Sequence, residues 1–188
     1  MPLSNPDTSG FTILYEDPAI LGINKTSYIP VTPSLLEKVK STLPEENSFL
    51  GLVHRIDRPI TGVVLFARNP KALAELNLQF KERKVKKIYW AVTEAPPPHE
   101  SGTLEHLLLF DHKKNKSYVL SYTSIPPKGA RKAKPALLDY RLVGISERYF
   151  FLEIELVTGR PHQIRCQLSA IGCHVKGDLK YGARRSNS

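Results

Sequence analysis

The strongest constraint on the fold is a strand, a tight turn and a helix that follow one another directly over residues 149–172. Residues 149–157 show the alternation of a strand whose sheet has one wetter face: Phe150, Leu152, Ile154 and Leu156 alternate with Glu153 and Glu155. Gly159 follows this strand, Pro161 occupies a position that a first helical turn tolerates, and Gly172 stands where a helix would end. The pattern predicts a strand, a turn and a helix in that order.

The predicted helix has two distinct faces. Its apolar residues at positions i, i+4 and i+7 should pack inward: Ile164, Leu168 and Ile171. A neighbouring face carries His162, Arg165 and Ser169, so Arg165 can stand at the edge of a pocket. The helix N-terminus, with Arg160 and His162, suits a phosphate or a carboxylate. The alternative is that the arginines are surface charges and that His162 is a capping side chain.

A single acid, Asp57, lies between Arg55 and Arg58 in the stretch 53–62, directly before the apolar run 63–67. A carboxylate in a loop that enters a buried strand is held by a rigid element, and neighbouring arginines favour its ionised form. Such an aspartate can act as a nucleophile or as a base. The alternative is that Asp57 only shapes the turn, because Asp before Pro and Gly is a common turn former.

Further strands follow from alternation and from turn residues. We expect a hairpin over residues 11–25, and strands over 63–67, 86–93, 103–110, 117–123 and 136–143. In the strand over 86–93, Ile88, Trp90 and Val92 lie on one side, and Tyr89 faces away from Trp90.

Two more helices are predicted. The first covers residues 30–47, with Thr32 or Ser34 as its cap and Pro44 at its end. The second begins after the cap Asn69 and runs to about residue 84. The apolar residues of each helix share one face: Leu35, Leu36 and Val39 in the first, and Leu73, Leu76 and Phe80 in the second.

Composition fits one globular domain, residues 1–188, with an apolar fraction of 41%. No run of about 18 apolar residues occurs, so no membrane partner is expected. The N-terminus does not resemble a secretory signal, and two cysteines imply no disulfide framework, so a reduced, cytoplasmic compartment is expected. Cys166 and Cys173, with His162 and His174, match no common paired-cysteine zinc spacing, so no metal is expected.

Basic residues outnumber acidic ones by 27 to 18, which gives a net charge of +9. The basic residues form three clusters, over 81–87, 113–116 and 128–134, whereas the acids are scattered. A solvated surface explains any one cluster. Three clusters together with the net charge favour a nucleic acid as the partner.

Four stretches resemble the motifs of the RluA-type RNA pseudouridine synthases, in the order of that family. They are residues 54–57 followed by Gly62, residues 87–91, residues 159–165, and residues 172–182. The resemblance implies an α+β domain with a large, mainly antiparallel mixed sheet, flanking helices and a central cleft. It also implies cofactor-free isomerisation of uridine to pseudouridine in ribosomal or transfer RNA, by a monomer that requires no protein partner.

The resemblance also implies a role for individual residues. Asp57 would be the essential carboxylate, either attacking the anomeric carbon or assisting removal of a sugar proton. Tyr89 would stack on the base or act as a base, Arg165 would pair with Asp57, and Ile164 would form the floor of the uracil pocket. The substrate-binding residues would be His54, Arg55 and Arg58 around the flipped nucleotide, together with Arg160 and His162.

Three departures from the family pattern stand out. Ile60-Thr61 replaces the usual Thr-Ser, and residues 24–28 lack the proline and glycine of the family's early motif. The chain is expected to lack the further C-terminal strand that closes such domains, which would leave a sheet edge uncovered. It is also expected to lack an appended N-terminal RNA-binding module.

Two other functions compete with catalysis on RNA. One is an RNA-binding or RNA-chaperone domain of the same fold with little or no catalysis. The other is a metal-dependent phosphoesterase that uses His54 and Asp57, although the sequence shows no carboxylate-rich cluster.

Overall fold

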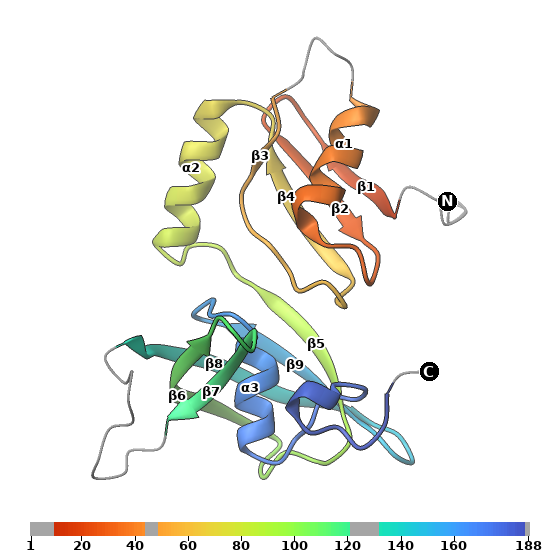
Figure 1. Ribbon diagram of the computed structural model, residues 1–188, viewed down its shortest axis with the longest axis vertical. Coiled ribbons are helices and arrows are strands. Elements are labelled where there is room, and N and C mark those ends of the chain that lie inside the picture. The colour runs from red at the N-terminus through yellow and green to blue at the C-terminus, as the bar shows by residue number, and fades with distance from the viewer. Residues whose placement is uncertain (1–9, 44–48, 121–131, 187–188) are drawn as a thin grey trace. The chain divides into compact units, whose positions relative to one another are not determined.

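A computed structural model describes residues 10–43, 49–120 and 132–186 (Figure 1). The predictions about the N-terminal residues 1–6, the helix end at Pro44, the strand residues 121–123 and the basic residues Lys128 and Arg131 lie outside the described residues. The chain divides into two compact units, residues 1–84 and 85–188.

The first unit contains an antiparallel sheet in the order β1-β2-β4-β3. Its strands are β1 (Phe11–Glu16), β2 (Ile20–Lys25), β3 (Gly51–Leu52) and β4 (Gly62–Ala67). Leu21 is paired with Phe66 and Ile23 with Val64, and all four side chains are fully buried on one face. Asp17 Oδ1 closes the β1–β2 turn by accepting the N–H groups of Ala19 at 2.7 Å and Ile20 at 2.6 Å. The predicted hairpin over residues 11–25 is confirmed.

The helix predicted from residue 30 begins later than expected. A short helical turn, η1 (Val31–Leu35), precedes the regular helix α1 (Leu36–Thr42). Neither Thr32 nor Ser34 caps it, so that prediction is wrong. Thr32 is extended, with φ −129° and ψ 140°, because the ring of a following proline disfavours helical backbone at the residue before it. The predicted apolar stripe is confirmed, since Leu35 and Val39 are buried.

Helix α2 (Pro70–Lys81) starts as the sequence predicts. The side chain of Asn69 accepts the backbone N–H of Ala72 at 2.8 Å, which is the cap expected before Pro70. The helix ends at Lys81 rather than near residue 84, because Arg83 adopts a left-handed backbone with φ 58°.

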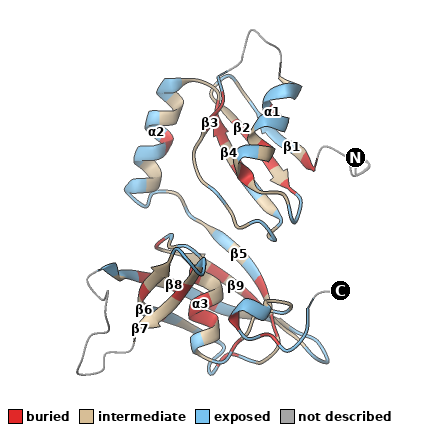
Figure 2. Ribbon diagram, viewed as in Figure 1, coloured by how far each residue is buried: buried red, intermediate tan, exposed pale blue. Residues whose placement is uncertain are grey.

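The second unit is a five-stranded antiparallel sheet in the order β5-β9-β8-β6-β7. Its elements are β5 (Ile88–Thr93), β6 (Ser101–Asp111), β7 (Lys116–Leu120), β8 (Lys134–Ile145), β9 (Phe150–Leu156), helix α3 (Gln163–Ala170) and the short helix η4 (Leu179–Tyr181). Leu152 and Ile154 of β9 are fully buried in a core that includes Leu168 of α3. Buried residues on both elements are coloured red in Figure 2. The predicted strand, turn and helix are therefore confirmed.

The opposite face of this sheet is exposed to solvent, as the alternation predicts. Trp90 is 82% exposed, whereas Tyr89 on the other face is half-buried. Glu153 pairs with Arg141 at 3.0 Å, with both side chains partly exposed. Among the described residues, no helix is long and apolar enough to cross a membrane.

Candidate functional site

Asp57 lies in the loop that connects β3 to β4 in the first unit, and it is half-buried. Its carbonyl oxygen accepts the N–H of Ile60 at 3.1 Å, which folds the loop into a tight turn. Gly62 begins β4 with φ 152°, a conformation that side-chain-bearing residues rarely adopt. Asp57 therefore shapes the turn through its backbone carbonyl.

Lys25 is a cation near Asp57 that the sequence analysis did not select. Its side chain is fully buried, and Nζ donates to the carbonyl of Thr26 at 2.8 Å and of Arg58 at 3.1 Å. Burial lowers the pKa of Lys25, while the negative charge of Asp57 acts in the opposite direction and raises it. The ammonium thus ties the end of β2 to the Asp57 loop and supplies positive charge to it.

The alternation of β2 could have identified Lys25 as a buried residue. Leu21 and Ile23 face the core, and Lys25 continues the same two-residue period. A lysine at an inward position of a strand is unusual, because charged side chains are rarely buried without partners.

The other predicted residues of this loop differ in their surroundings. His54 stacks on Phe80 of α2 with 5.1 Å between ring centroids, and its Nε2 accepts the N–H of Leu65 at 3.2 Å. His54 therefore anchors the loop to β4 and α2, and its Nε2 lone pair is already used, which disfavours a metal-binding role. Arg55 is exposed, and Arg58 donates from Nε to the carbonyl of Tyr28 at 3.0 Å.

Arg165 lies in α3 of the second unit and forms a bidentate ion pair with Asp178. Its Nε donates to Oδ2 at 2.6 Å and its Nη2 donates to Oδ1 at 2.8 Å. The side chains of Arg165 and Asp178 are only 16% and 9% exposed. Two parallel charge-assisted hydrogen bonds fix both the position and the plane of the guanidinium.

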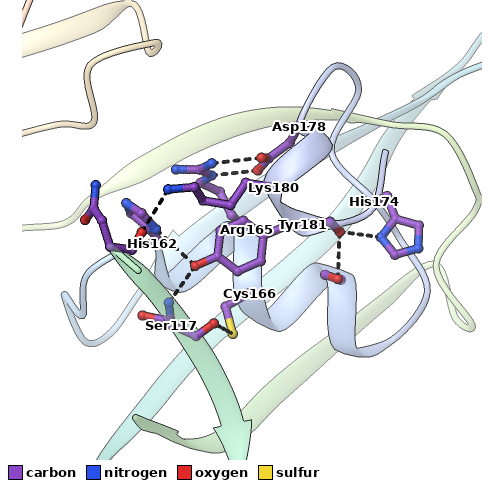
Figure 3. A network of polar contacts seen from close by, with 10 residues as sticks. Ser117, His162, Arg165, Cys166, His174, Asp178, Lys180 and Tyr181 are labelled. Atoms are coloured by element: carbon purple, nitrogen blue, oxygen red, sulfur yellow. Dashed lines mark hydrogen bonds and ion pairs between the residues drawn. The ribbon is translucent and has the colours of Figure 1, made fainter. Parts of the chain in front are cut away.

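The ring of Tyr181 lies against the guanidinium of Arg165 (Figure 3). The guanidinium carbon lies 4.9 Å from the centroid of the Tyr181 ring. The Tyr181 hydroxyl accepts the N–H of Ser117 at 2.7 Å and lies 3.0 Å from Nδ1 of His162. Ser169 Oγ donates to the Tyr181 carbonyl at 2.8 Å. The helix face predicted to carry His162, Arg165 and Ser169 is thus the face that packs on Tyr181.

The turn before α3 is capped by Gln163. Its Oε1 accepts the N–H of Arg160 at 2.9 Å and the hydroxyl of Thr158 at 2.8 Å. His162 has a left-handed backbone with φ 52° and makes no side-chain cap, so the capping alternative for His162 is wrong. Arg160 donates from Nε to the carbonyl of Pro135 at 2.9 Å.

Tyr89 and Ile164 pack against the same core cluster of the second unit. Ile164 precedes Arg165 in α3, so Tyr89, Ile164 and Arg165 all belong to the second unit. Asp57, His54, Arg55 and Arg58 belong to the first unit.

Cys166 and Cys173 are both free and buried. Cys166 Sγ donates to the carbonyl of Ser117 at 3.3 Å, and burial raises its pKa to about 11. Among the described residues, no group of three or more His, Cys, Asp and Glu side chains could hold a metal ion.

Comparisons with known proteins identify similar sequences. The family described as RNA pseudouridylate synthase matches residues 19–170. An uncharacterized RNA pseudouridine synthase of Chlorobaculum parvum is 33% identical, over 94% of this chain and 57% of the relative. Ribosomal large subunit pseudouridine synthase C of Vibrio parahaemolyticus is 32% identical, over 92% of this chain and 53% of the relative. The chain thus spans little more than half the length of these relatives.

Solved structures show the same fold. Human RNA Pseudouridylate Synthase Domain Containing 1 has a TM-score of 0.81 at 23% identity, over 96% of this chain and 73% of that chain. Human RNA Pseudouridylate Synthase Domain Containing 4 has a TM-score of 0.78 at 25% identity, over 94% of this chain and 72% of that chain. The predicted α+β pseudouridine synthase fold is confirmed.

Removal of the Tyr181 hydroxyl should destabilise the protein. In Tyr181→Phe, the buried N–H of Ser117 loses its acceptor and Nδ1 of His162 loses its contact with the hydroxyl. The expected loss is about 1–3 kcal/mol of unfolding free energy, measured by urea denaturation. Tyr118→Phe, on a half-buried tyrosine of β7, serves as the matched control. Equal unfolding free energies for the two variants would contradict the hydrogen bonding assigned to Tyr181.

Stability should also fall at alkaline pH. Burial raises the pKa of Cys166 from 9.0 to about 11 and that of Tyr181 from 10.0 to about 12. The unfolded chain releases these protons at lower pH than the folded chain does. The free energy of unfolding is therefore at its full value below about pH 9 and falls progressively up to about pH 12. Urea denaturation at increasing pH measures this slope. Cys166→Ser, which does not titrate there, should have a shallower slope, and an unchanged slope would contradict the assignment to Cys166.

Proposed function

Because the chain belongs to the RNA pseudouridylate synthase family, we propose that it isomerises uridine to pseudouridine in RNA, with Asp57 as the essential carboxylate. The observation that carries this proposal is the position of Asp57, in a tight loop beside the buried ammonium of Lys25. A neighbouring positive charge favours the ionised carboxylate that a nucleophile or a base requires.

The proposed reaction breaks the bond between the sugar carbon C1′ and N1 of uracil and forms a bond from C1′ to C5. The proton on C5 is lost and N1 gains one, so the reaction is neutral in mass and in redox state. No external electron or group donor is needed, so we propose that the reaction is cofactor-free. Asp57 either attacks C1′ or assists removal of a sugar proton, and both routes use the ionised carboxylate.

The second unit supplies the other proposed site residues. Tyr89 would stack on the uracil or act as a base, and Ile164 would form the floor of its pocket. Arg165 would pair with Asp57, with Asp178 holding its guanidinium in place through Nε and Nη2. A guanidinium has five N–H donors, so a second carboxylate can bind while Asp178 remains bound. We propose that the two units together form one catalytic domain.

The proposal also concerns which RNA is the substrate and which side chains contact it. Relatives named ribosomal large subunit pseudouridine synthase C make large-subunit ribosomal RNA the first substrate to test, with transfer RNA as the second. His54, Arg55, Arg58, Arg160 and His162 are the side chains proposed to surround the flipped nucleotide. Base flipping is required because the reacting bond is not accessible within a stacked strand. We expect a monomer that acts in the cytoplasm.

Asp57→Asn should abolish the reaction. Incubation with total RNA, followed by nuclease digestion and chromatography of the nucleosides, should show pseudouridine formation reduced roughly a thousandfold or more. Glu105→Gln removes one exposed carboxylate elsewhere and should retain full activity. Pseudouridine formation by the asparagine variant would contradict the role of Asp57. RNA binding by a wild-type protein that forms no pseudouridine would favour the non-catalytic alternative.

Asp178→Asn should impair catalysis through Arg165. The variant loses one of two charge-assisted hydrogen bonds, and a bond of about 1.5–3 kcal/mol corresponds to a loss of roughly tenfold or more in kcat. KM for RNA should change less than about twofold, because the proposed role is positioning rather than RNA contact. Asp139→Asn, an exposed acid of the same unit that accepts a hydrogen bond from Thr103, is the control. A kcat equal to that of the control would contradict the role of Asp178.

A further inference from the structure

The turn between β6 and β7 carries exposed basic residues on an ordered backbone. His112, Lys113 and Lys114 are exposed. Asp111 Oδ1 accepts the backbone N–H of Lys113 at 2.9 Å and of Lys114 at 3.1 Å. The lysine side chains make none of these hydrogen bonds, so the turn keeps its shape without using their charge.

A second element holds the same turn from outside the hairpin. Lys180 of η4 donates from Nζ to the carbonyl of Asn115 at 3.1 Å and reaches that of Lys114 at 3.5 Å. Lys116 Nζ lies 5.1 Å from the centroid of the Tyr181 ring and 5.6 Å from that of Tyr118. The turn and η4 thus bring together four lysines, which we call the turn lysine cluster: Lys113, Lys114, Lys116 and Lys180.

The charge of the turn lysine cluster is not balanced by acids. Within the described part of the chain, none of the four lysines has a carboxylate within 4.0 Å, whereas Lys86 pairs with Glu155 at 3.1 Å. Two acids of the neighbouring segments have other partners, since Asp111 accepts turn N–H groups and Asp178 holds Arg165. The like charges of the four lysines repel one another, so their proximity costs stability even though Lys180 also holds the turn.

The turn lysine cluster adjoins the predicted site residues of the second unit. The ring of Phe110, two residues before the turn, contacts His162 edge-on with 5.9 Å between centroids. Phe110 also contacts His112 edge-on at 4.9 Å. The end of β6 that leads into the basic turn therefore packs against the segment that carries His162 and leads into Arg165.

We infer that the turn lysine cluster is a docking surface for the phosphate backbone of RNA, on nucleotides that flank the target uridine. The inference rests on the proposed function, because it takes RNA as the substrate. Ammonium groups recognise phosphates as point charges and release the counterions condensed on the nucleic acid. The turn is already ordered before RNA arrives, so binding has only the lysine side chains to order there.

The test compares two double variants of equal charge. Lys113→Gln with Lys114→Gln removes two charges from the turn and leaves its backbone hydrogen bonds in place. Lys38→Gln with Lys40→Gln removes two charges from exposed positions of α1 and serves as the control. Binding is measured by fluorescence anisotropy with a fluorescein-labelled oligouridine over a series of salt concentrations.

The turn variant should bind roughly five- to tenfold more weakly at low salt. The slope of the logarithm of the association constant against the logarithm of the salt concentration should be smaller in magnitude by about 1.4. This corresponds to two lost phosphate contacts on a single strand. The control should change affinity less than about twofold. Equal weakening by both variants would show a general charge effect and overturn the inference, as would no weakening by either. Because anisotropy reports binding and does not depend on turnover, absence of pseudouridine formation would overturn the proposed function and leave this result intact.

Discussion

Arg165 is a largely buried cation, with 16% of its side chain exposed, and the arrangement of the second unit follows from the partners that it requires. A buried charge is costly unless it is paired and hydrogen-bonded. Asp178 satisfies two N–H donors and the Tyr181 ring covers one face of the guanidinium. Tyr181 in turn accepts the N–H of Ser117 in the edge strand β7 and contacts His162. One arginine and its partners thus join α3, the segment after it and the edge of the sheet.

The first unit also contains a buried cation that requires hydrogen-bond partners, Lys25. The buried ammonium of Lys25 donates to two backbone carbonyls, those of Thr26 and Arg58. Because the Arg58 carbonyl belongs to the Asp57 loop, the hydrogen bonds that stabilise the lysine also position the loop. His54 fixes the same loop from its other end, through Phe80 and the N–H of Leu65. Asp57 is therefore held on both sides by side chains from regular elements.

Elements with a clear period were predictable from the sequence, and contacts between distant segments were not. The alternation around Leu152 placed β9 and its buried face, and Asn69 before a proline marked the start of α2. The cap of α1 was mispredicted because the proline after Thr32 outweighs the capping preference of its hydroxyl. The pairing of Arg165 with Asp178 depends on how the segment after α3 folds back, which local propensity does not determine.

The proposed chemistry explains why such rigid positioning matters. An isomerisation that breaks and forms bonds at one sugar carbon must keep the detached uracil close while its orientation changes. No cofactor is proposed to hold the base, so the protein surface must do so, and effective molarity depends on groups held within a narrow geometry. Tyr89 and Ile164 pack on a buried core, and Arg165 is fixed by a bidentate pair. If these residues form the proposed site, they have little side-chain freedom to lose when the base binds, which would favour retention of the detached uracil over its release.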